Sequence, residues 1–199
     1  MNLEEYRMVF ATGSLALILI AAAPTLSLIV PFSGGSERFS ELWLLGPGHM
    51  AEGYPFNVGV GEEYSVFVGV GNHMGSSSHY MVYVKFRNQT QALPNATASE
   101  PSSLAPLYVF QFFVADGDTW ESLLTFKISD ASVEGDSMFV GNVTINDTAF
   151  SVNSSSMWDS ENNGFYYQLF FELWLYDMAS NGFKYHNRFV GLWLNMTGS

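Results

Sequence analysis

The chain has 199 residues, no cysteine, 16% aromatic residues and only 13% charged residues. The lack of cysteine excludes disulfide frameworks, thiolate zinc sites and a cysteine nucleophile. Seven basic against 19 acidic residues give a formal net charge of -12, which would repel nucleic acid phosphates. We therefore expect no nucleic acid partner.

An uncharged stretch near the N-terminus predicts a membrane segment. No residue between Arg7 and Glu37 is charged, and an apolar run of this length can cross a bilayer, which needs about 20 residues. The small residues Ala21, Ala22 and Ala23 would also suit a signal peptidase, so cleavage is an open alternative. The predicted organisation is a short cytoplasmic N-terminus (1–7), a signal-anchor transmembrane helix in membrane lipid (8–32) and one further domain (33–199).

Six Asn-x-Ser/Thr sequons follow the apolar stretch and none precedes it. N-linked glycans are transferred outside the cytoplasm, so the sequons indicate a single-pass protein of the cell membrane with an extracellular C-terminal domain. We expect Asn142 to be accessible opposite Val143, and Asn195 to point outward. The candidate glycosylation sites are Asn88, Asn95, Asn142, Asn146, Asn153 and Asn195.

Beyond Glu37 apolar and polar residues alternate with period two, which is typical of strands with one buried face. Turn dipeptides such as Asn181-Gly182 separate the runs. The pattern predicts a mostly β domain, an immunoglobulin-like two-sheet antiparallel sandwich preceded by one transmembrane helix. About nine strands are predicted, at 41–45, 63–70, 79–87, 106–114, 119–129, 138–145, 149–152, 165–176 and 183–196.

Two irregular regions interrupt this pattern. In the last strand Phe183 and Tyr185 lie on one parity but Val190 and Leu192 lie on the other, so a β-bulge is expected near 187–189. The long loop 88–105 holds two sequons and two prolines and is expected to be a mobile, glycosylated excursion.

The residue types that carry chemistry form one weak candidate metal site. Asp116, Asp118 and Glu121 have a spacing that can gather oxygen ligands around calcium, although the same residues suit an ordinary turn. Glu134 and Asp136 could add ligands only if their loop lay at the same end of the domain. No other metal site, cofactor-binding site or catalytic residue is predicted.

Other polar and aromatic residues have structural interpretations. The four histidines are scattered, without metal-binding spacing, and Asn72 and His73 are expected to satisfy turn backbones. Tryptophans at alternating positions are expected in the core. Trp158 is the exception, because the residues after it read as a loop.

The segment 39–86 carries the motifs of a known family. The motifs are Phe39-Ser40-Glu41, Tyr54-Pro55-Phe56-Asn57 with Gly61-Glu62, Val68-Gly69-Val70-Gly71-Asn72-His73, and Tyr80 with Val82 and Val84. The segment resembles the extracellular part of an archaeal membrane-protein family known only as domain of unknown function sixteen-sixteen, and residues 170–197 resemble its closing hairpin. The resemblance implies an archaeal cell surface and no known catalytic residues. Members commonly carry several transmembrane helices, whereas this chain has one.

These observations favour a membrane-anchored, N-glycosylated cell-surface protein that acts by binding or assembly and has no catalytic activity. Its partner would be a protein in the membrane or cell envelope. The alternative is an accessory subunit of a larger membrane enzyme or transporter, with a glycan-related role, whose helix packs on a helical body through small residues such as Gly13. An independent glycan-active enzyme would need two carboxylates facing a cleft.

Overall fold

The computed structural model describes residues 6–7, 10–18 and 37–196, which belong to two units, Met1–Arg38 and Phe39–Ser199. In the first unit, residues 6–7 and 10–18 are helical. No helix in the described part of the chain is long and apolar enough to cross a membrane. Most of the predicted membrane segment, at 8–9 and 19–32, lies outside the described residues.

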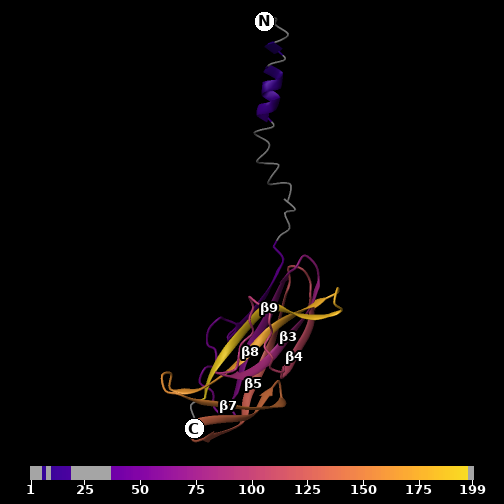
Figure 1. Cartoon of the computed structure of the whole chain (residues 1–199). Coiled ribbons are helices and arrows are strands. Elements are labelled where there is room, and N and C mark those ends of the chain that lie inside the picture. The colour runs from indigo at the N-terminus through magenta and orange to yellow at the C-terminus, as the bar shows by residue number, and fades with distance from the viewer. Residues whose placement is uncertain (1–5, 8–9, 19–36, 197–199) are drawn as a thin grey trace. The chain divides into compact units, whose positions relative to one another are not determined.

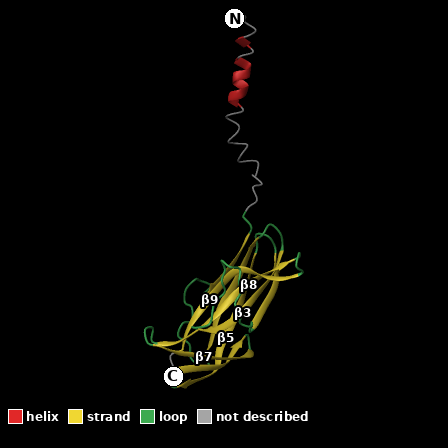
Figure 2. Ribbon diagram, in the orientation of Figure 1, coloured by secondary structure: helices red, strands yellow, loops and turns green. Residues whose placement is uncertain are grey.

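The second unit is built from strands and loops (Figure 2). Each of the nine predicted strands is confirmed, and several are longer than predicted because the structure extends them into polar sequence. The strands, most of them labelled in Figure 1, are β1 (Phe39–Leu45), β2 (Glu63–His73), β3 (Ser78–Asn88), β4 (Tyr108–Val114), β5 (Thr119–Glu134), β6 (Ser137–Ile145), β7 (Thr148–Asp159), β8 (Gly164–Asp177) and β9 (Gly182–Met196).

Every pairing between these strands is antiparallel. One part of the sheet has the order β1-β2-β5-β6-β7, and the other has the order β4-β3-β8-β9. The two parts are joined through β7, which pairs with β6 along most of its length and with β8 only at Trp158 and Asp159. The long strand β7 therefore carries the chain from one part of the sheet to the other.

Both parts of the sheet contribute side chains to one hydrophobic core. Val66 of β2 and Leu124 of β5 belong to the same buried cluster as Val82 of β3 and Leu169 of β8. Rings from the two parts also touch, since Phe112 of β4 stacks on Trp120 of β5 with ring centroids 3.6 Å apart. The prediction of a mostly β antiparallel domain is confirmed.

The predicted bulge in the last strand is also confirmed. Leu173 pairs with Arg188 and Trp174 pairs with Tyr185, which leaves His186 and Asn187 as extra residues of β9. Asn187 adopts a φ of 55° there. Because the bulge adds two residues, it keeps the alternation in phase, and Phe183 and Tyr185 lie on the same face of the sheet as Trp193.

The loop between β3 and β4 is fastened to the sheet at Ser102, while its residues 97–101 are exposed. The loop residue Ser102 is buried, and its backbone N–H donates to Glu172 Oε1 at 2.7 Å. Lys85 Nζ donates to Ser102 O at 2.8 Å and lies 2.9 Å from Glu172 Oε2. Lys85 and Glu172 are 3% and 0% exposed, so a buried ion pair fastens the loop to the sheet.

Candidate functional site

The alternation of side chains along β9 places one tryptophan on the face away from the core. Leu192 and Leu194 are buried, whereas Trp193 between them is 40% exposed. Successive side chains of a strand point to opposite faces, so Trp193 lies on the face of β4-β3-β8-β9 that is turned away from the core. We call this surface the outer face.

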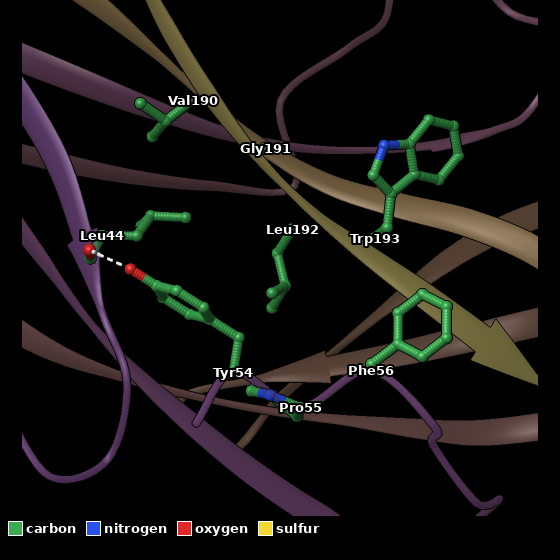
Figure 3. Close-up of a pocket in the computed structure, with 8 residues that line it drawn as sticks. All are labelled: Leu44, Tyr54, Pro55, Phe56, Val190, Gly191, Leu192 and Trp193. Carbon is green, nitrogen blue, oxygen red and sulfur yellow. Dashed lines mark hydrogen bonds between the residues drawn. The ribbon is translucent and has the colours of Figure 1, made fainter. Parts of the chain in front are cut away.

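A loop segment before β2 runs beside the end of β9. Asn57 forms a parallel bridge with Asn195, and the Asn195 backbone N–H donates to Phe56 O at 2.6 Å. On the other side of the bridge, the Val58 N–H donates to Asn195 O at 3.0 Å. These bonds hold Phe56, which is 47% exposed, close to Trp193 (Figure 3).

A first hollow of about 390 Å³ lies between this segment and β9, and we call it the Tyr54 hollow. The Tyr54 ring extends across it, and its hydroxyl donates to Leu44 O at 2.8 Å (Figure 3). The rings of Phe56 and Trp193 stand together at one end. The hollow is lined by Leu44, Tyr54, Pro55, Phe56, Val190, Gly191, Leu192 and Trp193, and is therefore predominantly apolar.

A second hollow, also of about 390 Å³, shares Phe56 and Trp193 with the first, and we call it the Asp159 hollow. The Tyr166 ring lies 6.5 Å from Trp193 between centroids and is inclined to it by 82°. Its hydroxyl donates to Asn162 O at 2.6 Å. The hollow is lined by Phe56, Gln89, Asp159, Asn162, Tyr166 and Trp193, so aromatic rings meet a polar rim.

Asp159 is held in an ionised state by the turn that follows β7. Its Oδ1 accepts the backbone N–H groups of Glu161 and Asn162 at 2.9 and 3.1 Å, and its Oδ2 accepts Asn162 Nδ2 at 2.8 Å. These bonds, with that from the Asn162 side chain the largest, lower the pKa of Asp159 below its ordinary value. The rim of the hollow therefore carries a fixed negative charge at neutral pH.

Trp193 rests on a buried cation. The guanidinium carbon of Arg87 lies 5.4 Å from the centre of the Trp193 ring, within cation–π distance. Arg87 Nη1 donates to Gln168 Oε1 and Nη2 donates to Gln89 O, both at 2.9 Å. Arg87 is 5% exposed, and burial lowers its pKa below the ordinary value. The indole is therefore held from one side by an immobilised side chain.

This arrangement suits binding. Exposed aromatic rings can pack against the apolar face of a ligand, while amide and carboxylate oxygens accept hydrogen bonds at its edge. Asp159 is the single carboxylate in the described lining of its hollow.

A comparison with protein families finds a match for the part of the chain that contains Phe56 and Gln89. The model of Domain of unknown function (DUF1616) matches residues 33–138, more than half of the chain. The chain belongs to this family. The predicted resemblance is thereby confirmed, although the closing hairpin lies beyond the DUF1616 match. No curated protein matches the chain.

The match with DUF1616 divides the candidate site. Phe56 and Gln89 lie within the matched residues, whereas Asp159, Tyr166 and Trp193 follow them along the chain. The fold brings the two groups together, because β3 pairs with β8 and the segment around Asn57 bridges to β9.

The calcium candidates are not brought together. Asp116 Oδ1 accepts the Gly75 N–H at 2.7 Å, which ties the turn before β5 to the end of β2. Glu134 and Asp136 lie at the opposite end of the long strand β5. Within the described residues, no group of three or more His, Asp or Glu side chains could hold a metal ion. The weak calcium candidates Asp116, Asp118 and Glu121 therefore do not form a ligand set in this structure, and the turn interpretation accounts for Asp116.

Two exposed histidine–glutamate pairs occupy the surface of β1, β2 and β5. His49 Nδ1 lies 3.0 Å from Glu121 Oε1, and His73 Nε2 lies 3.7 Å from Glu41 Oε2. Exposed pairs of this kind contribute little to stability. Glu121, a calcium candidate in the sequence, is thus part of a surface ion pair.

The candidate glycosylation sites differ in exposure. Asn95 and Asn153 are exposed, and Asn88, Asn142 and Asn146 are partly buried. Asn195 is only 5% exposed, because the segment around Asn57 covers it, and its Nδ2 donates to Asn57 Oδ1 at 3.2 Å. Asn195 lies on the outer face, as predicted, but the segment around Asn57 keeps its side chain from solvent.

Sequence reasoning missed the aromatic part of the site. It singled out Trp158, which is 43% exposed as expected but belongs to β7 rather than to a loop. Trp193 was grouped with the core tryptophans. The signal that identifies it is the alternation in β9, since Trp193 lies between the buried Leu192 and Leu194 and must point to the opposite face.

Proposed function

We propose that the chain is a membrane-anchored, N-glycosylated protein of an archaeal cell surface whose β domain acts by binding. The observation that carries this proposal is the pair of hollows that share Phe56 and Trp193. Exposed aromatic clusters of this kind are expensive to leave in water and are typical of recognition surfaces. The domain would bind its partner without transforming it.

The location and finer architecture belong to the same proposal. Support for the membrane anchor and the extracellular domain comes from the uncharged stretch after Arg7 and from the six sequons that follow it. Support for an immunoglobulin-like sandwich comes from the antiparallel pairing and from the core shared by both parts of the sheet.

The proposal is tested by cross-linking in native membranes. Wild-type protein is expected to be recovered in a defined complex, and Trp193→Ala is expected to reduce that recovery strongly. Phe113→Ala is the matched control, because Phe113 is 72% exposed on β4 but lines neither hollow. A wild-type protein that stays monomeric and captures no partner would contradict the proposal.

A second candidate function is that of an accessory subunit of a larger membrane enzyme or transporter. The observation that favours it is the helix at 10–18, whose apolar side chains Phe10, Leu17 and Ile18 are exposed within its own unit. A Cβ added at Gly13 would meet nothing within 4 Å, so a larger residue there is tolerated by the unit itself. If the helix packs on a helical body, Gly13→Leu should release a polytopic partner that Trp193→Ala retains.

A further inference from the structure

The Asp159 hollow combines features that point to a particular class of ligand. Its walls are the rings of Phe56, Tyr166 and Trp193, and its rim carries Gln89, Asp159 and Asn162. We propose that it binds a neutral saccharide, whose C–H face packs on Trp193 and Tyr166 and whose hydroxyl groups donate to the rim. This inference rests on the proposed binding function and specifies its ligand.

The angle between the rings leaves space for a sugar ring. Tyr166 and Trp193 are nearly perpendicular, at 82°, with centroids 6.5 Å apart, and Phe56 is inclined to Tyr166 by 41° at 6.1 Å. The rings therefore form a corner, and a pyranose can pack one face on the first ring and its edge against the second. A hollow of about 390 Å³ lies within the size range of small-molecule sites.

The rim has acceptors to spare for hydroxyl groups. An ionised carboxylate offers about four lone-pair positions, and Asp159 uses three of them for the bonds to Glu161 and Asn162. Within the described part of the chain, Asn162 Oδ1 and Gln89 Oε1 accept no hydrogen bond, while Gln89 Nε2 donates to Met157 O at 3.3 Å. Planar amides and a carboxylate around an aromatic floor match the alternating polar edge and apolar face of a sugar.

Charge restricts the ligand to neutral saccharides. The hollow contains the ionised Asp159, the neighbouring Glu161 is exposed, and the whole chain carries a formal charge of -12. A uronate, sulfated or phosphorylated sugar would bring a second negative charge to this rim. Arg87 cannot contact the negative group of such a sugar, because its guanidinium lies behind Trp193 and bonds Gln168 and Gln89.

The aromatic floor is also held in place before a ligand arrives. Gln168 holds Arg87, Arg87 supports Trp193, and Gln168 itself lies over Gly191, where an added Cβ would approach Gln168 Nε2 to 2.3 Å. A side chain that is already ordered loses little conformational entropy on binding. The structure thus supplies a preorganised platform suited to a weak, sugar-sized ligand.

The experiment is ligand-observed saturation-transfer NMR on the full chain, produced without glycosylation and held in a detergent that contains no sugar. Methyl β-D-glucopyranoside and N-acetylglucosamine are the neutral probes, and methyl β-D-glucuronide is the anionic one. We expect transfer to the ring C–H protons of the neutral probes, with a Kd of about 1 mM, and at least about tenfold weaker binding of the glucuronide.

Variants separate the site from the rest of the outer face. Trp193→Ala and Tyr166→Ala should each weaken the binding of the neutral probes by about tenfold. Asp159→Asn should reduce the difference in affinity between the neutral probes and the anionic probe. Phe113→Ala should leave binding unchanged. The near-ultraviolet circular dichroism of each variant shows whether it is folded, and Asp159→Asn, at an exposed turn, provides the second measurement if the aromatic variants unfold.

Three results would overturn the inference. The first is no saturation transfer from folded wild-type protein to either neutral probe. The second is equal loss of binding in Trp193→Ala and Phe113→Ala. The third is binding of a proline-rich peptide, which also packs on aromatic rings, in place of the sugars. If a complex is captured in membranes but no sugar binds, the proposed function stands and only the saccharide inference fails. If sugar binds but no membrane partner is captured, the saccharide inference stands and the proposal of a membrane partner fails.

The same binding measurement, made on the glycosylated chain, distinguishes a saccharide carried by this chain from one carried by another molecule. Asn88, a candidate glycosylation site, adjoins Gln89 at the rim, so a glycan on this chain could reach the hollow. If glycosylated wild-type protein loses probe binding and Asn88→Gln restores it, the bound saccharide is the chain's own. If glycosylation at Asn88 has no effect, the saccharide comes from another molecule.

Discussion

At the scale of single residues, Asn72 shows how one buried amide joins the turn after β2 to the end of β4. Its Nδ2 donates to Ser76 O and to Val114 O, both at 2.9 Å, and its Oδ1 accepts the Met74 N–H at 3.0 Å. Asn72 is fully buried, whereas the side chain of His73 beside it lies near the exposed Glu41 and stacks on the ring of Phe39. The expectation that both residues satisfy turn backbones is therefore confirmed for Asn72, and for His73 the structure shows a different role.

This contrast gives a matched pair of substitutions. Asn72→Ala leaves two carbonyls and one N–H without their partner and should lower the free energy of unfolding by about 2–3 kcal/mol. His73→Ala removes an exposed contact with Glu41 and should change the free energy of unfolding by less than about 1 kcal/mol. Urea unfolding of the two variants measures both values, and equal losses would show that the three bonds are not the source of the difference.

A second residue, His186, makes the stability of the fold depend on pH. His186 Nε2 lies 3.0 Å from Ser40 Oγ, which is 2.7 Å from the hydroxyl of buried Tyr80. Burial, followed by the nearby charge of Arg188, lowers the pKa of His186 below its ordinary 6.5. The unfolded chain therefore takes up a proton at higher pH than the folded domain does. The contribution to stability is complete above about pH 6.5 and is lost as the pH falls toward the folded-state pKa.

The pH effect is measured by urea unfolding of wild-type protein and His186→Asn between about pH 8 and pH 5, where histidine titrates. We expect the wild type to lose more of its unfolding free energy over this interval than the variant does. Above pH 6.5 the difference between them should stay constant. Parallel curves over the whole interval would rule out His186 as the titrating group.

At the scale of elements, the loop between β3 and β4 depends on the buried Lys85–Glu172 pair. Lys85→Met would leave Glu172 charged, buried and without its cation, at a cost of about 3–5 kcal/mol. The double variant Lys85→Met with Glu172→Leu removes both charges and should recover a large part of that loss. Urea unfolding measures the stabilities, and limited proteolysis should cleave the loop faster in the single variant. A double variant no more stable than the single one would contradict this account.

The strands could be predicted from sequence, but the surfaces that cover them could not. Alternation in β2 and β3 reports which residues face the core, because the period of a strand is fixed at two. The same alternation classes Lys85, Glu172 and Asn195 as outward, and this is geometrically correct. They are nevertheless buried, because loops far away in sequence lie over them. Local periodicity contains no information about which loop covers which face.

The candidate site, too, could be predicted from the sequence only in part. The outward position of Trp193 follows from the alternation of apolar residues in β9. Its neighbours come from three segments, around Phe56, around Gln89 and in the β7–β8 hairpin with Asp159 and Tyr166, and only the assembled sheet brings them together. The DUF1616 match includes the first two of these segments and not the third.

At the scale of the whole molecule, exposure predicts which sequons carry glycans. Asn95 and Asn153 are exposed and should be occupied, whereas Asn195 is 5% exposed beneath the segment at Asn57 and should be unoccupied. Glycopeptide mass spectrometry of protein from its native membrane measures the occupancy of each site. Substantial glycan at Asn195 would mean that this segment is displaced from β9 in the mature protein. Absence of glycan from every sequon would remove the main support for an extracellular domain.

The route of the chain through the sheet also dictates when the domain can close during synthesis. β5, β6 and β7 are successive hairpin partners and can associate as soon as they emerge, whereas β3 must wait for β8, which follows it by about 80 residues. β8 in turn gains its second neighbour only when β9, the last strand, is complete. Until β8 is in place, one edge of β3 is unpaired, so a nascent chain leaving the ribosome or translocon is vulnerable to aggregation over most of its length. Truncation by a single C-terminal strand should therefore be far more harmful than its 15 residues suggest.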